Sequence, residues 1–262
     1  MSLTLILILV ISGCLVGFIN ALSAGGTVIS IALYLALGLP AYAANATNRI
    51  GVLFQSSSTA LMMNRQHLLP RRTSLLLALP TMLGALVGAL ASTLLTAHFF
   101  SYCMGAILLM MIVFLFAHPS ALYSDNEEKI KRGLHWWHYA VFFAIGLYGG
   151  FIQVGTGFFL MTAGTVLVGY DIIKTNAMKT AIMFLYTLVA LAVFCFQGQI
   201  YWSYGLLHSL GAVFGAWLAT RFAVKKGTKY VRWVIIVVII LTALNLFGTI
   251  DLQSFFKNIT TH

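Results

Sequence analysis

Polar residues recur at helical spacing within two apolar stretches of this chain. In Ala43–Met63 they are Asn45, Asn48, Arg49, Gln55, Ser56 and Thr59. At about 100° per residue these side chains fall within a stripe roughly 120° wide on an otherwise apolar helix. In Asn176–Phe196 a second stripe holds Asn176, Lys179, Thr180, Tyr186 and Thr187. Two stripes that each carry one cation and several neutral hydrogen-bonding groups predict a site for a small, oxygen-rich anion.

The composition shows what must surround these stripes. The chain has 262 residues, of which 61% are hydrophobic and 8% charged, and its mean hydropathy is +0.97. This amount of apolar surface needs lipid as its solvent, which predicts an all-α polytopic membrane protein in a lipid bilayer. The net charge of +10 does not indicate nucleic acid, because Lys and Arg gather in short loops between apolar runs.

About ten hydrophobic segments follow from the apolar runs, in two sets of five. The second segment of each set, Thr27–Leu37 or Phe158–Gly169, is too short to span the hydrocarbon unaided. The others are Leu3–Leu22, Ala43–Met63, Ser74–Leu95, Phe99–Phe116, Trp137–Val154, Asn176–Phe196, Trp202–Phe222 and Val231–Phe247. Whether the short segments cross fully or are re-entrant stays open at this stage.

The two sets resemble each other in sequence. A shift of 131 positions places Gly26 on Gly157 and Asn45 on Asn176. This repeat predicts a first membrane repeat at 1–117, a cytoplasmic loop at 118–135, a second membrane repeat at 136–250 and a short C-terminal tail at 251–262.

The basic loops predict the orientation of these repeats. They follow the third, fifth and ninth segments, and contain Arg65, Arg71, Arg72, Lys129, Lys131, Arg132, Arg221, Lys225, Lys226 and Lys229. The positive-inside bias places them in the cytoplasm, so the third segment runs inward and the eighth runs outward. The sequence therefore predicts two inverted five-segment repeats in a multi-pass protein of the cell (inner) membrane, with both termini outside.

Small residues interrupt the chain just before each short segment. The breaks are Ala24-Gly25-Gly26 and Gly155-Thr156-Gly157. Broken segments at matching places in inverted repeats indicate the midplane site of a secondary transporter. The helix that starts after a break presents free N–H groups and a partial positive charge, which favour an anion.

Structural alternatives exist for several of these residues. The glycines of both breaks can serve close helix packing, which is also the interpretation of Gly84, Gly88, Gly211 and Gly215. Arg49 and Lys179 can be cations near helix ends that extend to the interface and only set orientation.

Two stretches of the chain resemble a known family. They are Ala44-Asn45-Ala46-Thr47-Asn48-Arg49-Ile50-Gly51-Val52, preceded by Gly17-Phe18-Ile19-Asn20, and Gly149-Gly150-Phe151-Ile152-Gln153-Val154-Gly155-Thr156-Gly157. They are similar to the signatures of the sulfite exporter TauE/SafE family, also called the TSUP family of probable membrane transporters. The resemblance implies an inner-membrane permease that exports sulfur-containing anions such as sulfite, sulfoacetate or other sulfonates. The family's usual triple glycine is altered in both halves, so the shape of the pocket is expected to differ.

The resulting prediction is a non-enzymatic exporter that binds a sulfite- or sulfonate-class anion between the repeats, without cofactor or metal. Its expected substrate-binding residues are Gly25, Gly26, Asn45, Asn48, Arg49, Gln55, Gly155, Thr156, Gly157, Asn176, Lys179 and Thr180. The alternative is a membrane assembly or regulatory partner that transports nothing and uses its polar stripes for helix packing. A membrane-embedded enzyme is disfavoured because no acid–base pair is evident. A homo-oligomer is compatible with the sequence, although no motif indicates one.

Overall fold

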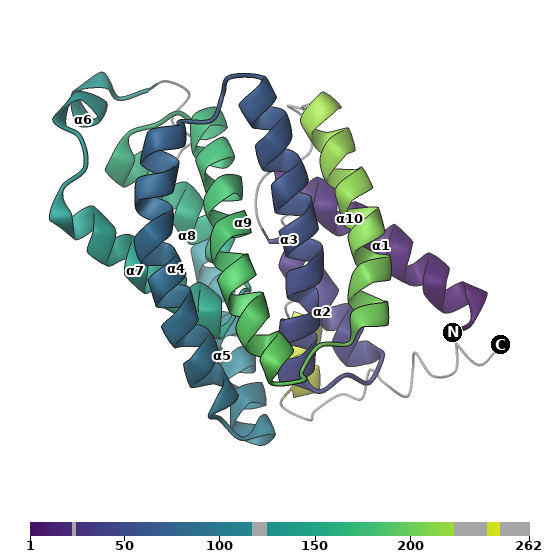
Figure 1. Ribbon diagram of the computed structural model, residues 1–262. Helices are drawn as coiled ribbons and strands as arrows, with labels where there is room; N and C mark the ends of the chain where they lie inside the picture. The colour runs from purple at the N-terminus through teal and green to yellow at the C-terminus, as the bar shows by residue number, and fades with distance from the viewer. Residues whose placement is uncertain (23–24, 117–124, 223–239, 247–262) are drawn as a thin grey trace.

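A computed structural model describes residues 1–22, 25–116, 125–222 and 240–246 of the chain (Figure 1). Its described residues are helical and contain no strand, so the prediction of an all-helical protein is confirmed. The elements are α1 Leu3–Leu22, α2 Gly26–Ala36, α3 Ala41–Arg65, α4 Arg71–Thr93, α5 Ala97–Phe116, α6 Glu127–Arg132, α7 Trp136–Phe151, α8 Thr156–Thr162, the π-helix η1 Ala163–Val168, α9 Ile172–Phe196 and α10 Trp202–Phe222. Most of the predicted segment Val231–Phe247 lies outside the described residues, and 240–246 are helical.

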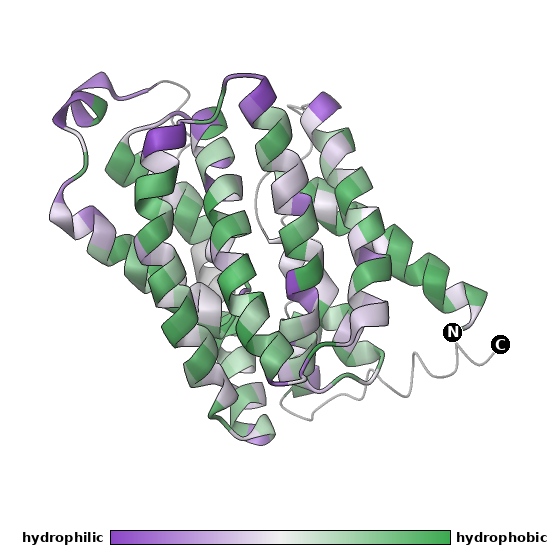
Figure 2. Cartoon of the chain, viewed as in Figure 1, coloured by the Kyte–Doolittle hydropathy of each residue, from purple (hydrophilic) through white to green (hydrophobic). Residues whose placement is uncertain are grey.

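Three helices of the described part, α1, α4 and α9, are long and apolar enough to cross a membrane. Exposed leucine and isoleucine side chains recur along the outer faces of α1 and α4, at Leu3, Leu7, Ile11 and Leu15 on α1 and at Leu75, Leu79 and Leu83 on α4. Figure 2 shows that hydrophobic residues predominate along α1 and α4. An exposed apolar face of this length is stable only against lipid, which supports a membrane protein.

Helix α3 is long but much more polar than its neighbours, and it lies inside the bundle. It packs against α9 on one side and α10 on the other, and hydrophilic residues appear in its middle (Figures 1 and 2). Asn45, Asn48, Arg49 and Gln55 are all buried. Polar groups at this depth are tolerated because they face protein rather than lipid.

Glycines bring two helix pairs into close contact. In the α4–α7 pair, a Cβ added at Gly84 or Gly88 would lie about 2 Å from the carbonyl oxygen of Phe143 or Leu147. The α1–α10 pair uses Gly211 and Gly215 in the same way, with Val10 and Cys14 opposite. The packing interpretation of Gly84, Gly88, Gly211 and Gly215 is therefore confirmed.

Gly88→Ala is expected to destabilise the α4–α7 pair because the new methyl group would meet the Leu147 carbonyl at 2.0 Å. Overpacking of this kind costs about 1–3 kcal/mol, or roughly 3–10 °C in the melting temperature of a protein of this size. Thermal unfolding of the detergent-solubilised protein measures the effect. Val87→Ala, at the exposed neighbouring position, is the control. Equal melting temperatures for both variants would contradict the close contact.

The basic residues gather at one end of the bundle. The end of α3, the start of α4, α6 and the end of α10 all lie at the top of Figure 1, and they carry Arg65, Arg71, Arg72, Lys129, Lys131, Arg132 and Arg221. Lys225, Lys226 and Lys229 lie outside the described residues. Helices α3 and α9 run in opposite directions along this axis (Figure 1). These placements agree with the predicted cytoplasmic side.

The predicted loop 118–135 contains a short helix that the apolar pattern did not reveal. Helix α6 and the two residues before it contact η1 and the start of α9. Lys129 Nζ donates to the Val166 carbonyl and Asn126 N donates to the Gly169 carbonyl. Asp125 pairs with Lys174 and accepts from the N–H of Asp171. Burial alone would raise the pKa of the Asp125 carboxyl. Hydrogen bonds from Lys174 and from the backbone N–H of Asp171 outweigh that effect and lower this pKa below its usual value.

Candidate functional site

The chain is broken at the two places where the glycine pattern predicted it. Helix α1 ends at Leu22 and α2 begins at Gly26, whereas α7 ends at Phe151 and α8 begins at Thr156. The residue before each new helix is glycine in the left-handed conformation, with φ 106° at Gly25 and 78° at Gly155. Only glycine adopts this conformation without steric cost, so the backbone requires glycine at Gly25 and Gly155.

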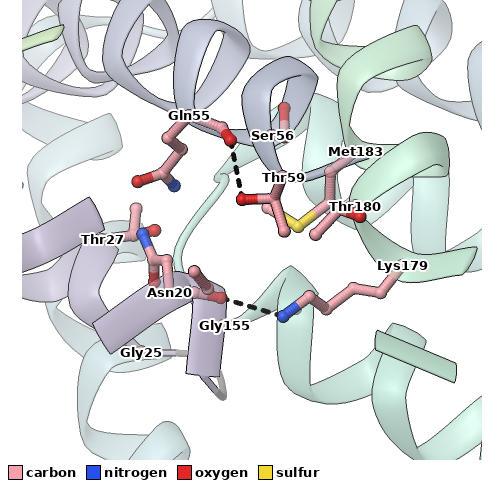
Figure 3. A pocket seen from close by; sticks show the side chains of 12 residues that line it. Asn20, Gly25, Thr27, Gln55, Ser56, Thr59, Gly155, Lys179, Thr180 and Met183 are labelled. Atoms are coloured by element: carbon pink, nitrogen blue, oxygen red, sulfur yellow. Dashed lines mark hydrogen bonds between the residues drawn. The ribbon is translucent and has the colours of Figure 1, made fainter. Parts of the chain in front are cut away.

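A small pocket lies between the two breaks and the long helices α3 and α9 (Figure 3). Figure 3 shows Asn20, Thr27 and Gln55 on one side of it and Lys179, Thr180 and Met183 on the other. The full lining is Asn20, Ala21, Gly25, Thr27, Gln55, Ser56, Thr59, Gly155, Gly157, Lys179, Thr180 and Met183. Four separate segments of the chain therefore meet at one polar cavity.

Lys179 supplies the charge of this pocket. It is the only charged residue among the described residues that line it. The side chain is 1% exposed, and its Nζ donates to the backbone carbonyl oxygen of Asn20 at 3.0 Å (Figure 3). An ammonium group in a cavity without a lining carboxylate creates a local excess of positive charge, which favours an anionic ligand.

Two side-chain amides complete the polar lining. Asn20 Oδ1 accepts a hydrogen bond of 2.8 Å from the backbone N–H of Gly26. Its Nδ2 is buried and has no hydrogen-bond partner among the described residues, and the same holds for Gln55 Oε1. A buried polar atom without a partner costs free energy, so these groups indicate where a ligand or water would bind.

The N-terminal part of the α3 stripe does not line the pocket. Its side chains bond to the end of α7, in the second half of the chain. Arg49 donates to the carbonyl oxygens of Gly149 and Gly150, at 3.1 and 2.6 Å, at the end of α7. Asn45 Nδ2 donates to the Phe151 carbonyl at 3.1 Å. These side chains therefore satisfy carbonyl groups that the end of α7 leaves without intrahelical partners.

Helix α9 does the same for the end of α1. Asn176 Nδ2 donates to the Ala21 carbonyl at 2.8 Å, beside the contact of Lys179 with Asn20. Helices α3 and α9, which carry the two polar stripes, thus each bond to the end of the broken helix of the opposite half. We call these contacts of Asn45, Arg49, Asn176 and Lys179 the crosswise bonds.

The expected site residues therefore fall into two groups. Six of them line the pocket: Gly25, Gln55, Gly155, Gly157, Lys179 and Thr180. Five others lie beside it or in the crosswise bonds: Gly26, Asn45, Arg49, Thr156 and Asn176. The twelfth, Asn48, is buried outside the lining, and its side-chain amide has no hydrogen-bond partner among the described residues. The alternative in which Arg49 and Lys179 extend to the membrane interface is wrong, because they are 0% and 1% exposed and bond to buried carbonyl groups.

Six lining residues were not among the expected site residues: Asn20, Ala21, Thr27, Ser56, Thr59 and Met183. Of these, Asn20 has the most informative contacts. It lies just before the first break and corresponds to Gln153 in the second half, so the repeat contained a signal. The repeat did not show the direction of the Asn20 amide, because that direction depends on a bond from the N–H of Gly26, which joins the start of α2 to the end of α1.

Comparisons with known proteins agree on one family. The family model described as "Sulfite exporter TauE/SafE" matches residues 9–246. The "Probable membrane transporter protein ORF9" of Sinorhizobium sp is 28% identical over 242 residues, covering 92% of each chain. A "Probable membrane transporter protein" of Haemophilus influenzae is 26% identical, covering 89% of this chain and 91% of its own. "Probable membrane transporter protein YfcA" of Escherichia coli K12 is 24% identical, covering 86% and 82%. No solved structure matches the chain.

Proposed function

Because the chain belongs to the sulfite exporter TauE/SafE family of membrane transporters, we propose that it is a permease that exports small sulfur-containing oxyanions such as sulfite and sulfonates. The observation that carries the proposal is the pocket between the two breaks, in which Lys179 is the only lining charge among the described residues. The anion binds there, against an ammonium group and neutral hydrogen-bonding side chains. Neither enzymatic chemistry nor a cofactor is needed for this function.

The surroundings of the pocket support an anionic substrate. Helix α2 starts at the pocket, so its N-terminal end adds a partial positive charge to that of Lys179. Thr27 and Gln55 contribute a hydroxyl and an amide group, whereas the Thr180 hydroxyl already donates to the Ala177 carbonyl at 2.9 Å. An oxyanion with several acceptor oxygens can use such a set of donors, whereas a cation would have to bind next to an ammonium group.

We also propose that the two halves are inverted repeats and that transport moves them relative to each other. The opposite directions of α3 and α9 and the matching breaks support this arrangement (Figure 1). Each half contributes one broken helix and one long helix with a polar stripe to the same pocket. Outward movement of an anion across an inside-negative membrane gains roughly 2.3 kcal/mol per charge per 100 mV, which favours export.

The test is flux into liposomes that contain the purified protein. Saturable uptake of sulfite and ethanesulfonate, absent from protein-free liposomes and increased by an inside-positive potential, is the expected result. Cations and neutral solutes of similar size should not compete. If no oxyanion moves or binds, the permease proposal fails, and the non-transporting assembly partner becomes the better interpretation of the crosswise bonds.

Gly25→Ala is expected to reduce this uptake as well as stability. The φ of 106° at Gly25 strains any residue with a Cβ by about 1–2 kcal/mol, and Gly25 lines the pocket. Gly38→Ala is the matched control. Its φ is 90°, but a Cβ there meets nothing within 4 Å and Gly38 is not part of the lining. Both variants should melt at lower temperature, while only Gly25→Ala should slow uptake. Equal uptake by the two variants would place the transport route elsewhere.

A further inference from the structure

The side-chain amide of Asn20 is oriented by a hydrogen bond from the backbone of Gly26. Its Oδ1 accepts from the N–H of Gly26, across the break between α1 and α2. A carboxamide oriented by its oxygen must present its NH₂ group on the other side. That Nδ2 is buried, has no hydrogen-bond partner among the described residues and belongs to a residue that lines the pocket. The residue is only 8% exposed, so bulk water does not easily supply the missing acceptor.

Lys179 approaches the same residue from the opposite side of the pocket. Its Nζ bonds to the backbone oxygen of Asn20, as Figure 3 shows. The Lys179 side chain therefore extends across the cavity to Asn20, so the ammonium group and a residue with an unpartnered amide group both line it. The remaining lining residues are uncharged, and so are Ser23 and Ala24 in the sequence of the break.

The balance of charge limits what can bind. One ammonium group compensates one negative charge, and a second negative charge would remain uncompensated in a buried cavity. Removing an unpaired charge from water costs several kcal/mol even after the protein relaxes. A sulfonate that also bears a carboxylate would need a second cation, and the described lining contains none.

We propose that Asn20 Nδ2 and Lys179 Nζ together form the recognition site for a singly charged oxyanion, and that the single lining charge of Lys179 makes this site select monoanions over dianions. This inference rests on the proposed function and specifies its substrate class. The Asn20 amide donates to one oxygen of a sulfonate or hydrogensulfite group, and Lys179 binds the charge. Thr27 lines the same pocket and offers a hydroxyl to a further oxygen of the same group.

Two sulfonates of equal carbon number test the selectivity. Ethanesulfonate carries one negative charge, and sulfoacetate carries a carboxylate in addition to its sulfonate. Uptake of ethanesulfonate into liposomes should exceed that of sulfoacetate by about tenfold or more. At equal concentration, ethanesulfonate should also raise the melting temperature of the purified protein more than sulfoacetate does. Equal uptake or equal stabilisation by the two anions would overturn the monoanion proposal. Failure of both anions, together with sulfite, would instead overturn the proposed function.

Asn20→Asp tests the residue itself. An aspartate keeps an oxygen for the N–H of Gly26 but replaces the free donor by a second oxygen, and its charge cancels that of Lys179. Ethanesulfonate uptake should fall by at least about tenfold while the protein remains folded. Wild-type uptake in this variant would overturn the role of Asn20.

Gln153→Glu is the matched control because Gln153 is the counterpart of Asn20 in the second half. Its Nε2 donates to Thr187 Oγ1 at 3.2 Å, and it is not part of the pocket lining. This variant should bind ethanesulfonate more tightly than Asn20→Asp does, in the thermal-shift assay. If Asn20→Asp fails to fold, the preference of the wild-type protein between the two sulfonates decides the proposal.

Discussion

Replacing Lys179 by glutamine is expected to reduce anion uptake strongly while leaving the protein folded. Glutamine retains an N–H donor for the Asn20 carbonyl, whose distance from Nζ is 3.0 Å, but removes the charge. A hydrogen bond to a charged group contributes about 1.5–3 kcal/mol, so the affinity for an anion should fall roughly 10- to 100-fold. Uptake of sulfite and ethanesulfonate into liposomes measures this loss, and the melting temperature of the purified variant reports on folding.

Lys174→Gln provides the control on the same helix. Lys174 pairs with Asp125 at the start of α9, its side chain is 40% exposed, and it is not part of the pocket lining. Uptake by this variant should stay close to that of the wild-type protein. If both lysine variants lose uptake equally, or if Lys179→Gln loses stability in proportion to uptake, Lys179 is a structural residue and the pocket binds its ligand without it.

Arg49→Met should have the largest effect on stability. The guanidinium is fully buried, donates to the Gly149 and Gly150 carbonyls and lies 4.7 Å from the centre of the Phe194 ring. Methionine fills part of the space but leaves two carbonyl oxygens at the end of α7 without a donor. Each unsatisfied group costs about 1–3 kcal/mol. We therefore expect a loss of roughly 2–4 kcal/mol, or about 5–15 °C in melting temperature.

Arg221→Met is the control for this prediction. Arg221 lies over the Trp217 ring at 5.2 Å near the end of α10, and it is exposed to solvent. The same substitution there should change the melting temperature by no more than about 2 °C. A different outcome, in which Arg49→Met keeps its melting temperature and loses only anion uptake, would make Arg49 a substrate ligand and exclude a purely structural role for the crosswise bonds.

The polar stripe of α3 illustrates why residue type alone does not assign a role. Its two ends have different functions, although helical spacing places them on one face. Asn45 and Arg49 bond to the end of α7, whereas Gln55, Ser56 and Thr59 line the pocket two to three turns later. Spacing determines the direction of a side chain from its own helix axis. The spacing does not show which backbone of a neighbouring helix lies beside each turn of α3.

Other features could be predicted because they depend on local physics. Apolar runs predicted α1 and α10 to the residue and the remaining long helices to within a few residues, since lipid-exposed segments must be continuously apolar. The left-handed conformation of Gly25 and Gly155 follows from glycine's freedom at a chain break. The short helix α6 and the π-helical form of η1 were not predicted. Both are linked to tertiary contacts of Lys129 and Asn126 with η1 and its end, which a local sequence pattern does not show.

The chain's residue types thus specified its lipid environment, its long helices, the two glycine breaks and the presence of two buried cations. Folding then assigned those cations to different tasks. Lys179 reaches a pocket because the end of α1 and the start of α2 meet α9 there, whereas Arg49 meets the closely packed carbonyl end of α7. The orientation of Asn20 likewise depends on an N–H six residues further along the chain, brought back by the turn at Gly25. Such assignments depend on which backbone groups lack partners at each position, and that is a property of the packed helices.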